Sequence, residues 1–549
     1  MNKKLLSFIL PLFLPILLRG QTTTAFDKVY TIFQSKCTAS CHSNAVKEGG
    51  LDLQGSGTDK QATVFANLVN ATPSNATAVS KGYKRIYAGR VDLSFLFHKT
   101  NGNFDTYYPT LTTAEGSVMP QSGTGLTKVE KEIIRQWILY GATKTVSIPE
   151  ERIRAYYDTV GKALAAFATP PPPPAANEGF QIKMGPYFLA PNGQVGKELE
   201  YYQKWELNMA SDLEVNRIDH IIASSSHHFI IYNYNKPSDA TNIPAGLRLA
   251  ANHNNINLVS AVQERLDLKL PAKTAFKWEK NRVLDLNSHY INYSAAHVYK
   301  AEAFLNIYTQ PIGTAKQEMK TVLIPNTFIF IPNNNQTVSF RQPIVNTTMG
   351  KIYVWALVGH THKYGTSYKI SRLNTDKTTD GELLYDGSCP GGIPGCPSPN
   401  FDYQHIPMRY FQPLNPVQMS YGISHEASWK NNGGNGVLFG PTSDDEMQVM
   451  IAMFTTDTLG LSGSKEVVEI ENVSVFPNPA KDVMTFKLPP SVSRCRFTLF
   501  DVLGRAVQNE PLIVGQMFDI QRNNLQSGVY LYRIEDQDGR LKMGKVLLE

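Results

Sequence analysis

Two histidines and a methionine could together hold a copper ion. His360 and His362 close an apolar segment as His-Thr-His, and Met447 follows an Asp-Asp-Glu run. Because residues i and i+2 of a strand point to the same side, both imidazoles can reach one metal ion. A thioether added to two imidazoles favours copper, and copper(I) in particular, over magnesium or calcium. Met450 and Met453 are alternatives to Met447, and the Asp-Glu-Met context favours Met447.

A second set of histidines lies earlier in the chain. His227 and His228 are adjacent at the start of an apolar segment, and His289 stands in Asn-Ser-His-Tyr. Neighbours on a regular strand point to opposite sides, so joint ligation by His227 and His228 requires a bulge or a strand end. The polar run 224–226 just before them permits such a distortion. His297 is an alternative to His289.

Two cysteines followed by a histidine indicate a covalently attached haem. Three residues separate Cys37 from Cys41, and His42 follows directly. The usual attachment motif is C-x-x-C-H, so this chain has one extra residue between the thiols. Met119, in Val-Met-Pro, is placed to be the second and softer iron ligand, with His98 as the alternative. The competing interpretation is a disulfide or two free thiols, with His42 incidental.

Helices are expected to position the cysteines. Apolar residues recur with helical spacing from Phe26 to Phe33. Thr127 and Glu130 form the capping box of a second helix. A third helix is expected from Ser147 to about Phe167, and it leads into the uninterrupted run Pro170–Pro174. This run predicts a stiff polyproline II spacer.

Strands are expected to position the histidines. From about residue 180 to residue 454, short apolar segments alternate with Asn, Gly and Pro clusters, which is typical of β-sandwiches. About 275 residues are too many for one small sandwich, so two are expected. Within this region, Cys389 and Cys396 could pair across a Pro/Gly-rich loop. The clearest strands are expected at His228–Tyr234, Ala303–Tyr308, Thr321–Ile324, Phe328–Ile331, Ile352–Val358 and Gln448–Phe454.

The order of the histidine motifs resembles the type II, ascorbate-dependent copper monooxygenases. His-His, His-Tyr, His-Thr-His and Asp-Glu-Met occur in that order over residues 180–455, as in the peptidylglycine α-hydroxylating and dopamine β-monooxygenases. The resemblance implies two copper ions, each in its own β-sandwich, facing each other across a solvent-filled cleft. The amidating enzymes carry an arginine where this chain has Val358, which argues against a peptide C-terminus as substrate. By resemblance, an electron-transfer copper binds His227, His228 and His289, and a dioxygen-activating copper binds His360, His362 and Met447.

Both ends of the chain resemble known domains. Residues 22–142 resemble bacterial c-type cytochrome domains: an N-terminal helix, the cysteine-histidine motif, a Met-Pro loop and a C-terminal helix with Trp137. The segments Val475–Ala480, Asp501–Arg505 and Ser527–Tyr530 resemble the type A C-terminal sorting domain of the type IX secretion system of Bacteroidetes. That resemblance implies a small Ig-like sandwich that directs export.

The fold expected from these features is multi-domain. An all-α cytochrome c-like domain would be followed by two all-β jelly-roll-type sandwiches and a small Ig-like β-sandwich. The expected boundaries are a signal peptide at 1–20, the haem domain at 21–145, a helix and proline-rich linker at 146–176, a first copper sandwich at 177–310, a second at 311–460, and the sorting domain at 466–549.

The N-terminus indicates where the protein works, and the net charge indicates which partners to expect. Lys3 and Lys4, the apolar run Leu5–Leu18 and small residues near Gly20 form a secretory signal. The formal net charge is +6, and removing Lys3, Lys4 and Arg19 with the signal leaves 6 − 3 = +3. A value so close to neutral gives no reason to expect nucleic acid as a partner. The mature protein should be secreted or held at the cell surface after passing through the periplasm.

The leading functional hypothesis is a secreted copper monooxygenase that hydroxylates a C–H bond. It would need dioxygen, an external electron donor and a small organic or peptide-like substrate, with the type IX machinery as its export partner. The haem fused to the same chain could deliver electrons to the copper at His227, His228 and His289. The alternatives are a non-catalytic haem and copper electron-transfer protein on the same scaffold, and an adhesion or binding module whose metals are structural.

Overall fold

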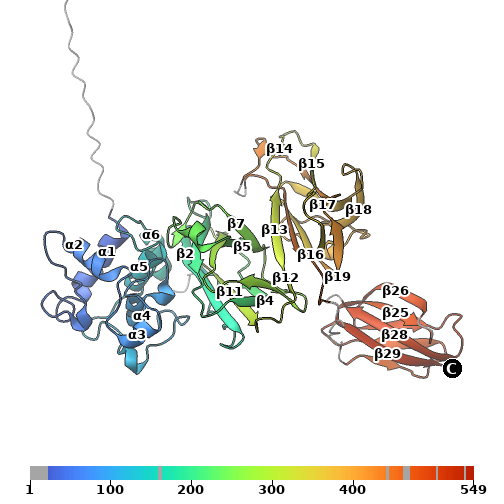
Figure 1. Cartoon of the computed structure of the whole chain (residues 1–549), viewed down its shortest axis with the longest axis horizontal. Coiled ribbons are helices and arrows are strands. Elements are labelled where there is room, and N and C mark those ends of the chain that lie inside the picture. The colour runs from blue at the N-terminus through green and yellow to red at the C-terminus, as the bar shows by residue number, and fades with distance from the viewer. Residues whose placement is uncertain are drawn as a thin grey trace, which may run out of the picture. The chain divides into compact units, whose positions relative to one another are not determined.

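The chain forms two compact units in a computed structural model, Met1–Leu461 and Ser462–Glu549 (Figure 1). The structure describes residues 23–158, 164–440, 444–461, 470, 472–502, 505–536 and 540–549. The signal peptide predicted at residues 1–20 lies outside the described residues.

Helices fill the first part of unit 1. The helix predicted from Phe26 to Phe33 is confirmed as α1, and the capping box predicted at Thr127 opens α5. The prediction of a third helix reaching Phe167 is wrong, because α6 ends at Asp158 among the described residues and β1 forms at Leu164. The helices are α1 (Ala25–Lys36), α2 (Lys60–Leu68), α3 (Ala76–Ser80), α4 (Phe95–Asn101), α5 (Lys128–Leu139) and α6 (Glu150–Asp158).

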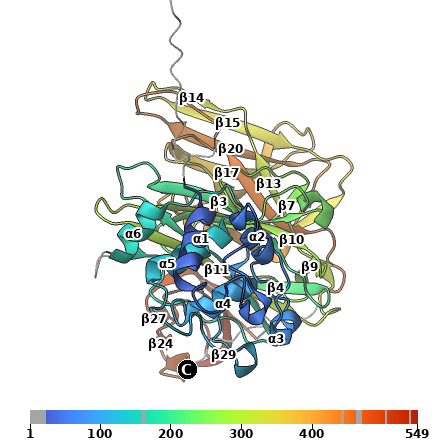
Figure 2. The ribbon, with the colours of Figure 1, turned by 90° about the vertical axis from the view of Figure 1, so that its left-hand side faces the viewer.

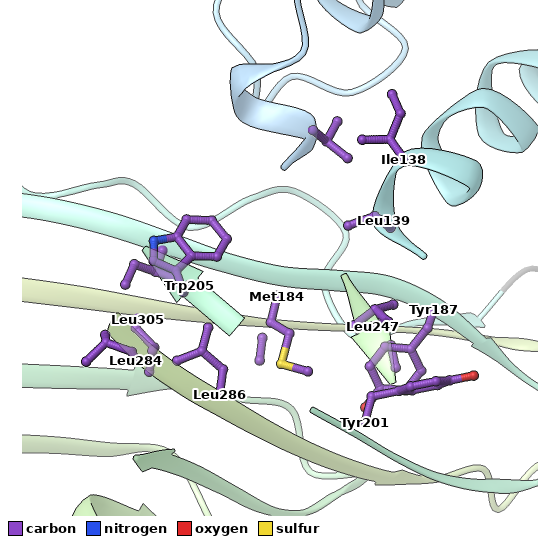
Figure 3. Close-up of a cluster of buried hydrophobic side chains, with 14 of the residues drawn as sticks. Ile138, Leu139, Met184, Tyr187, Tyr201, Trp205, Leu247, Leu284, Leu286 and Leu305 are labelled. Carbon is purple, nitrogen blue, oxygen red and sulfur yellow. The ribbon is translucent and has the colours of Figure 1, made fainter. Parts of the chain in front are cut away.

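The helical part does not form the all-α cytochrome c-like domain expected from the sequence. Strands and bridges hold 41% of the described residues and helices only 14%. The eight consecutive residues Glu132–Leu139 of α5 are all buried, so the last two turns of the helix are covered on every side. Ile138 and Leu139 share one hydrophobic core with side chains of the first β-sheets, including Met184 and Trp205 (Figure 3). The helices are therefore a cover on the β-structure rather than a separate domain.

Buried ion pairs also join the helices to the sheet. Arg135 of α5 pairs with Asp105 at 2.5 Å, and Lys183 of β2 (Gly179–Leu189) reaches Asp105 at 2.8 Å and Glu302 at 2.9 Å. All four side chains are less than one-tenth exposed. Burial disfavours the Asp105 carboxylate, but Arg135 and Lys183 outweigh this and lower its pKa. The charges therefore stabilise one another where water is excluded.

The first β-region consists of two sheets. A seven-stranded sheet runs in the order β1-β11-β4-β9-β12, with β2 on β11 and β8 on β4. Helices α1 and α5 cover this region in the view of Figure 2, and β2 lies beside the helices in Figure 1. Its other strands are β1 (Leu164–Ala165), β4 (Leu213–Ile221), β8 (Leu266–Lys269), β9 (Thr274–Trp278), β11 (Tyr299–Gln310) and β12 (Gln317–Glu318). The second sheet has the order β6-β3-β10-β5-β7, with β3 (Glu198–Glu206), β5 (Ser226–Tyr234), β6 (Leu247–Arg248), β7 (Ile256–Val262) and β10 (Val283–Ile291).

The second β-region also consists of stacked sheets. One has the order β13-β22-β16-β19, with β13 (Lys320–Pro325), β16 (Lys351–His360), β19 (Arg409–Gln418) and β22 (Val449–Thr455). The other has the order β15-β20-β17-β18, with β15 (Thr337–Ile344), β17 (Gly365–Leu373), β18 (Asp380–Asp386) and β20 (Ile423–Lys430). A two-stranded sheet pairs β14 (Phe330–Ile331) with β21 (Val437–Leu438), so the strand predicted from Phe328 begins later. The expected Cys389–Cys396 disulfide is present.

The two β-regions of unit 1 meet through an apolar contact. Leu258 of β7 clusters with Val449 and Ile451 of β22. The Thr321 hydroxyl of β13 donates to the Val259 carbonyl of β7 at 2.7 Å. This contact brings the sheet that contains β5 and β10 against the sheet that contains β16, and it fixes the distance between the histidines of the two regions.

Unit 2 is a small β-sandwich. One sheet has the order β23-β24-β27, with β23 (Ser474–Phe476), β24 (Val483–Lys487) and β27 (Met517–Gln521). The other has the order β26-β25-β28-β29, with β25 (Arg494–Phe500), β26 (Ala506–Val514), β28 (Gly528–Asp536) and β29 (Leu541–Leu548). Cys495 is buried in its core. The β-sandwich parts of the expected fold therefore agree with the structure.

Replacing Lys183 tests the link between the helices and the sheet. Lys183→Met leaves two buried carboxylates short of a positive partner, so we expect a loss of about 3–5 kcal/mol in unfolding free energy. Lys269→Met, at a side chain that is 66% exposed, is the control and should cost less than about 1 kcal/mol. Urea denaturation followed by circular dichroism measures both, and equal effects would contradict the structural role of the buried pairs.

Candidate metal centre

The first histidine group is built by a bulge in β5. His289 of β10 stands directly opposite His228, but the next pair is Tyr290 with Ser226. His227 is thus the extra residue of a bulge, which is the distortion that joint ligation by two neighbouring histidines requires. We call His227, His228 and His289 the first histidine group.

The second histidine group lies where β16 ends. His360 is the last residue of β16 and His362 follows two positions later. The buried Glu446 carboxylate shapes this turn by accepting the backbone N–H of His362 at 2.9 Å and that of Tyr364 at 2.7 Å. Trp429 donates its indole N–H to the same carboxylate at 2.8 Å. We call His360 and His362 the second histidine group.

The two groups meet at His227. Its ring centroid lies 5.0 Å from that of His289 and 5.4 Å from that of His228. It lies 6.3 Å from His360 and 5.7 Å from His362. Candidate ligand atoms lie within 4.8 Å of one another in two sets that share His227. The expectation of a solvent-filled cleft between the two groups is therefore wrong for this structure, because His227 lies beside His362 as well as beside His289, although each group belongs to its own β-region. We call the five imidazoles together the five-histidine centre.

Hydrogen bonds decide which ring nitrogens face the centre. His289 Nε2 lies 2.8 Å from Glu198 Oε1, so it carries the proton, and the buried Nδ1 has no hydrogen-bond partner. The Asn287 amide donates to Glu200 at 2.9 Å, which turns its oxygen toward His228 Nε2, also at 2.9 Å. His228 Nε2 must then be a donor, and its Nδ1 keeps the lone pair. In both rings the nitrogen that is free to bind a metal ion is Nδ1.

The other histidines complete the donor set. The buried His227 Nε2 also has no hydrogen-bond partner. His362 Nδ1 lies 3.0 Å from the Asp445 carbonyl oxygen, so it is a donor and leaves Nε2 as the ligand atom. A buried nitrogen with no partner is costly, and a metal ion would remove that cost. The residues present therefore fit a transition metal that prefers imidazole.

Burial keeps these imidazoles neutral. Burial lowers the pKa of His227 to about 3 and that of His362 to about 4, and neighbouring histidines lower the His227 value further. Burial is also the main cause that lowers the pKa values of His289 and His360. At neutral pH these rings keep their lone pairs for a metal ion, because no proton competes for them.

Met447 follows the residue that binds the His-Thr-His turn, which favours it as the methionine of the second group. Met447 directly follows Glu446, whose carboxylate binds the His-Thr-His turn, and it is partly buried. Its alternatives Met450 and Met453 are fully buried in hydrophobic cores. His297 belongs to neither histidine set, so the structure favours His289 over His297 as the third member of the first group.

The predicted haem residues line one cavity of about 560 Å³ in the helical part. Cys37, Cys41, His42 and Met119 all contribute to its wall. Among its apolar lining residues are Phe33, Leu51, Leu53, Phe95 and Leu96. Two predicted attachment thiols, two predicted iron ligands and an apolar wall in one cavity of this size fit a flat, largely apolar cofactor.

The two cysteines form no disulfide with each other in this structure, which leaves free thiols and haem attachment as the interpretations. Cys37 and Cys41 are free thiols, and burial raises the pKa of Cys37 to about 11. His42 Nδ1 lies 3.2 Å from the Leu51 carbonyl oxygen, which leaves Nε2 free as a ligand. His98 is buried with Nε2 2.9 Å from the Asp92 carbonyl oxygen, so it makes a structural contact.

Sequence reasoning missed the residues that orient the histidines. Glu198, Glu200 and Asn287 were not singled out, and Glu446 entered only as context for Met447. The signal available was the pattern Glu-Leu-Glu, which puts two carboxylates on one side of a strand. Their relation to the histidines depends on which strand pairs with β10.

Comparison with known families identifies the C-terminal unit. Residues 474–549 match the family described as a secretion system C-terminal sorting domain. The chain is exported. It is secreted or attached to the cell surface, and the type IX secretion machinery is its partner in that step. Among the described residues, no helix is both long and apolar enough to cross a membrane.

Other comparisons carry no argument about function. No curated protein matched the chain. CopC from Methylosinus trichosporium OB3b is 16% identical over 14% of this chain and 91% of its own, with a TM-score of 0.10. A β-D-glucuronidase for Dictyoglomus thermophilum is 10% identical over 42% of this chain and 44% of its own, with a TM-score of 0.15. The BSP domain of a biofilm-associated protein is 9% identical over 66% of this chain and 82% of its own, with a TM-score of 0.14.

The buried histidines make the metal-free protein sensitive to acid. The folded-state pKa values of His227 and His362 lie below the ordinary value of 6.5, so the unfolded chain binds more protons as pH falls. Their stabilising contribution is fully present above about pH 6.5 and is lost toward pH 3–4. We expect the double variant His227→Ala, His362→Ala to lose at least about 1 kcal/mol less stability than the metal-free wild type between pH 7 and pH 4. Urea denaturation at each pH measures this, and identical pH profiles would contradict it.

Proposed function

We propose that the protein is a secreted, copper-dependent monooxygenase that hydroxylates a C–H bond of an organic substrate with dioxygen. The observation that carries the proposal is the five-histidine centre, in which His227 Nε2 and His289 Nδ1 are buried without a hydrogen-bond partner. The sorting domain supports work outside the cell, where dioxygen and small organic substrates are available.

The donor set supports copper over harder cations. Magnesium and calcium prefer carboxylate, carbonyl and water oxygens, whereas imidazole suits copper and zinc. His360, His362 and the nearby Met447 would hold the copper that interacts with dioxygen. His227, His228 and His289 would hold the copper that passes electrons. When bound, the metal would supply redox chemistry and an affinity for dioxygen that no protein side chain has.

The protein residues have separate tasks in such a reaction. Hydroxylation by dioxygen inserts one oxygen atom into the C–H bond, takes up two electrons and two protons, and releases one water. Glu446 would hold the backbone at His362 and Tyr364, and so keep the His-Thr-His turn in place. The hydrogen bonds of Glu198 to His289 and of Asn287 to His228 keep each Nδ1 turned to the centre.

The two electrons would come from an external donor through a haem. The haem would be attached to Cys37 and Cys41 in the cavity of the helical part, with His42 and Met119 as iron ligands. The helices share one hydrophobic core with the first β-region, so a haem there would be held rigidly against the β-structure.

A non-catalytic electron-transfer or binding protein is the second candidate. The position of His227 in both ligand sets favours it, because a copper ion that binds this imidazole in one set competes with the other set for the same residue. Incorporation of ¹⁸O from ¹⁸O₂ into a hydroxylated product separates the candidates, since the second one forms no such product.

Copper binding should depend on His227. Mature protein reconstituted with copper should hold two copper ions per chain, and His227→Ala should lose at least one, because the residue belongs to both ligand sets. His405→Ala is the control, since this imidazole is 60% exposed and pairs with Asp402. Elemental analysis after desalting measures the copper content. A wild-type chain without copper would contradict the proposal.

Haem attachment should depend on both thiols. In a host with haem-attachment machinery, the wild type should carry one iron per chain and keep its haem after denaturing electrophoresis. Cys37→Ser with Cys41→Ser should lose the covalent haem, whereas Cys495→Ser, at a buried thiol of unit 2, should retain it. Haem-free wild type, or haem retained by the double variant, would contradict this part of the proposal.

A further inference from the structure

Two carboxylates stand behind the first histidine group. Glu198 and Glu200 belong to β3 and are two residues apart, so their side chains leave the strand on the same side. β3 pairs with β10, where Glu200 is opposite His289 and Glu198 is opposite Ile291. The strand pairing therefore places both carboxylates next to the rings of the first group.

Each carboxylate accepts a hydrogen bond from the N–H of a different ring. Glu198 Oε1 lies 2.8 Å from His289 Nε2, and Glu200 Oε1 lies 3.2 Å from His228 Nε2. Glu200 is held in place by two further donors, the Asn287 amide at 2.9 Å and the Tyr202 hydroxyl at 3.2 Å. The two carboxylate side chains are only 24% and 22% exposed, so water screens them weakly.

Such contacts change what the histidines prefer to bind. An imidazole that donates its second N–H to a carboxylate becomes a more basic ligand with a fixed ring orientation. Two negative charges one ring away from a bound ion also lower the energy of a divalent ion more than that of a monovalent ion. The second histidine group differs in this respect, because the ring nitrogen Nδ1 of His362 contacts a neutral backbone carbonyl.

We propose that Glu198 and Glu200 are positioning residues that make the first histidine group hold copper(II) in preference to copper(I). The inference deepens the proposed function, on which it rests, because it gives this group a bias toward the oxidised metal. A site with that bias gives up its electron readily once reduced, which suits a donor to a neighbouring centre.

The test measures copper affinity in both oxidation states. Mature chain, Glu198→Gln with Glu200→Gln, and the control Glu264→Gln are titrated against a copper(II) chelator, and under anaerobic reducing conditions against a copper(I) chelator. Glutamine keeps the size and a hydrogen-bond acceptor but removes the charge. Glu264 is exposed, so its variant controls for the loss of one negative charge at the surface. The expected result is a loss of about 10–100-fold in copper(II) affinity and a clearly smaller loss for copper(I).

The outcomes separate this inference from the proposed function. Equal losses in both states would overturn the inference, because they would mean that the carboxylates only support the structure. Unchanged affinities in the double variant would overturn it as well. A wild-type chain that binds neither copper(I) nor copper(II) would overturn the proposed function and the inference with it. A wild type that binds both, with a ratio that changes only in the double variant, supports both.

Discussion

The apolar contact between β7 and β22 is the constraint on which the histidine centre depends. Leu258 packs on Val449 and Ile451, and His360 is paired with Val449 in the adjacent strand. This packing sets His227, which protrudes from a bulge in one sheet, against the end of β16 in the other. Burial of the apolar side chains stabilises the contact. The same burial leaves two imidazole nitrogens without partners, a cost that a metal ion would remove.

Rigidity around the centre comes from groups that do not belong to it. Glu446 accepts a backbone hydrogen bond from the His-Thr-His turn. The rings of the first group are oriented by hydrogen bonds that involve Glu198, Glu200 and Asn287. On the far side of the first β-region, the last two turns of α5 are buried on all sides, and Asp105 links Arg135 of α5 to Lys183 of β2. The cavity of the helical part is therefore anchored to the sheet that supports β10.

Local features were predictable from the sequence because they depend on neighbouring residues. The helical spacing after Phe26 and the capping box at Thr127 need only the next few residues, and both predictions are confirmed. Joint ligation by His227 and His228 requires a bulge or a strand end, and the structure has the bulge. The secretion sorting domain was predictable because its motifs are specific.

Features that depend on packing between distant segments were not predictable. The burial of Ile138 and Leu139 against the sheet is invisible in the periodicity of α5 alone, and this led to the wrong expectation of an all-α domain. The hydrogen bond from His289 to Glu198 arises from the register of two strands far apart in the chain. The closeness of His227 to His362 depends on how two sheets stack, which no local pattern encodes.

Anomalous diffraction at the copper edge, from crystals of the copper-loaded protein, tests the central claim most directly. The account predicts copper within bonding distance of the unpartnered nitrogens of His227 and His289, with His360 and His362 in the same centre. Copper found only at exposed imidazoles such as His405, with the five-histidine centre empty, would contradict it.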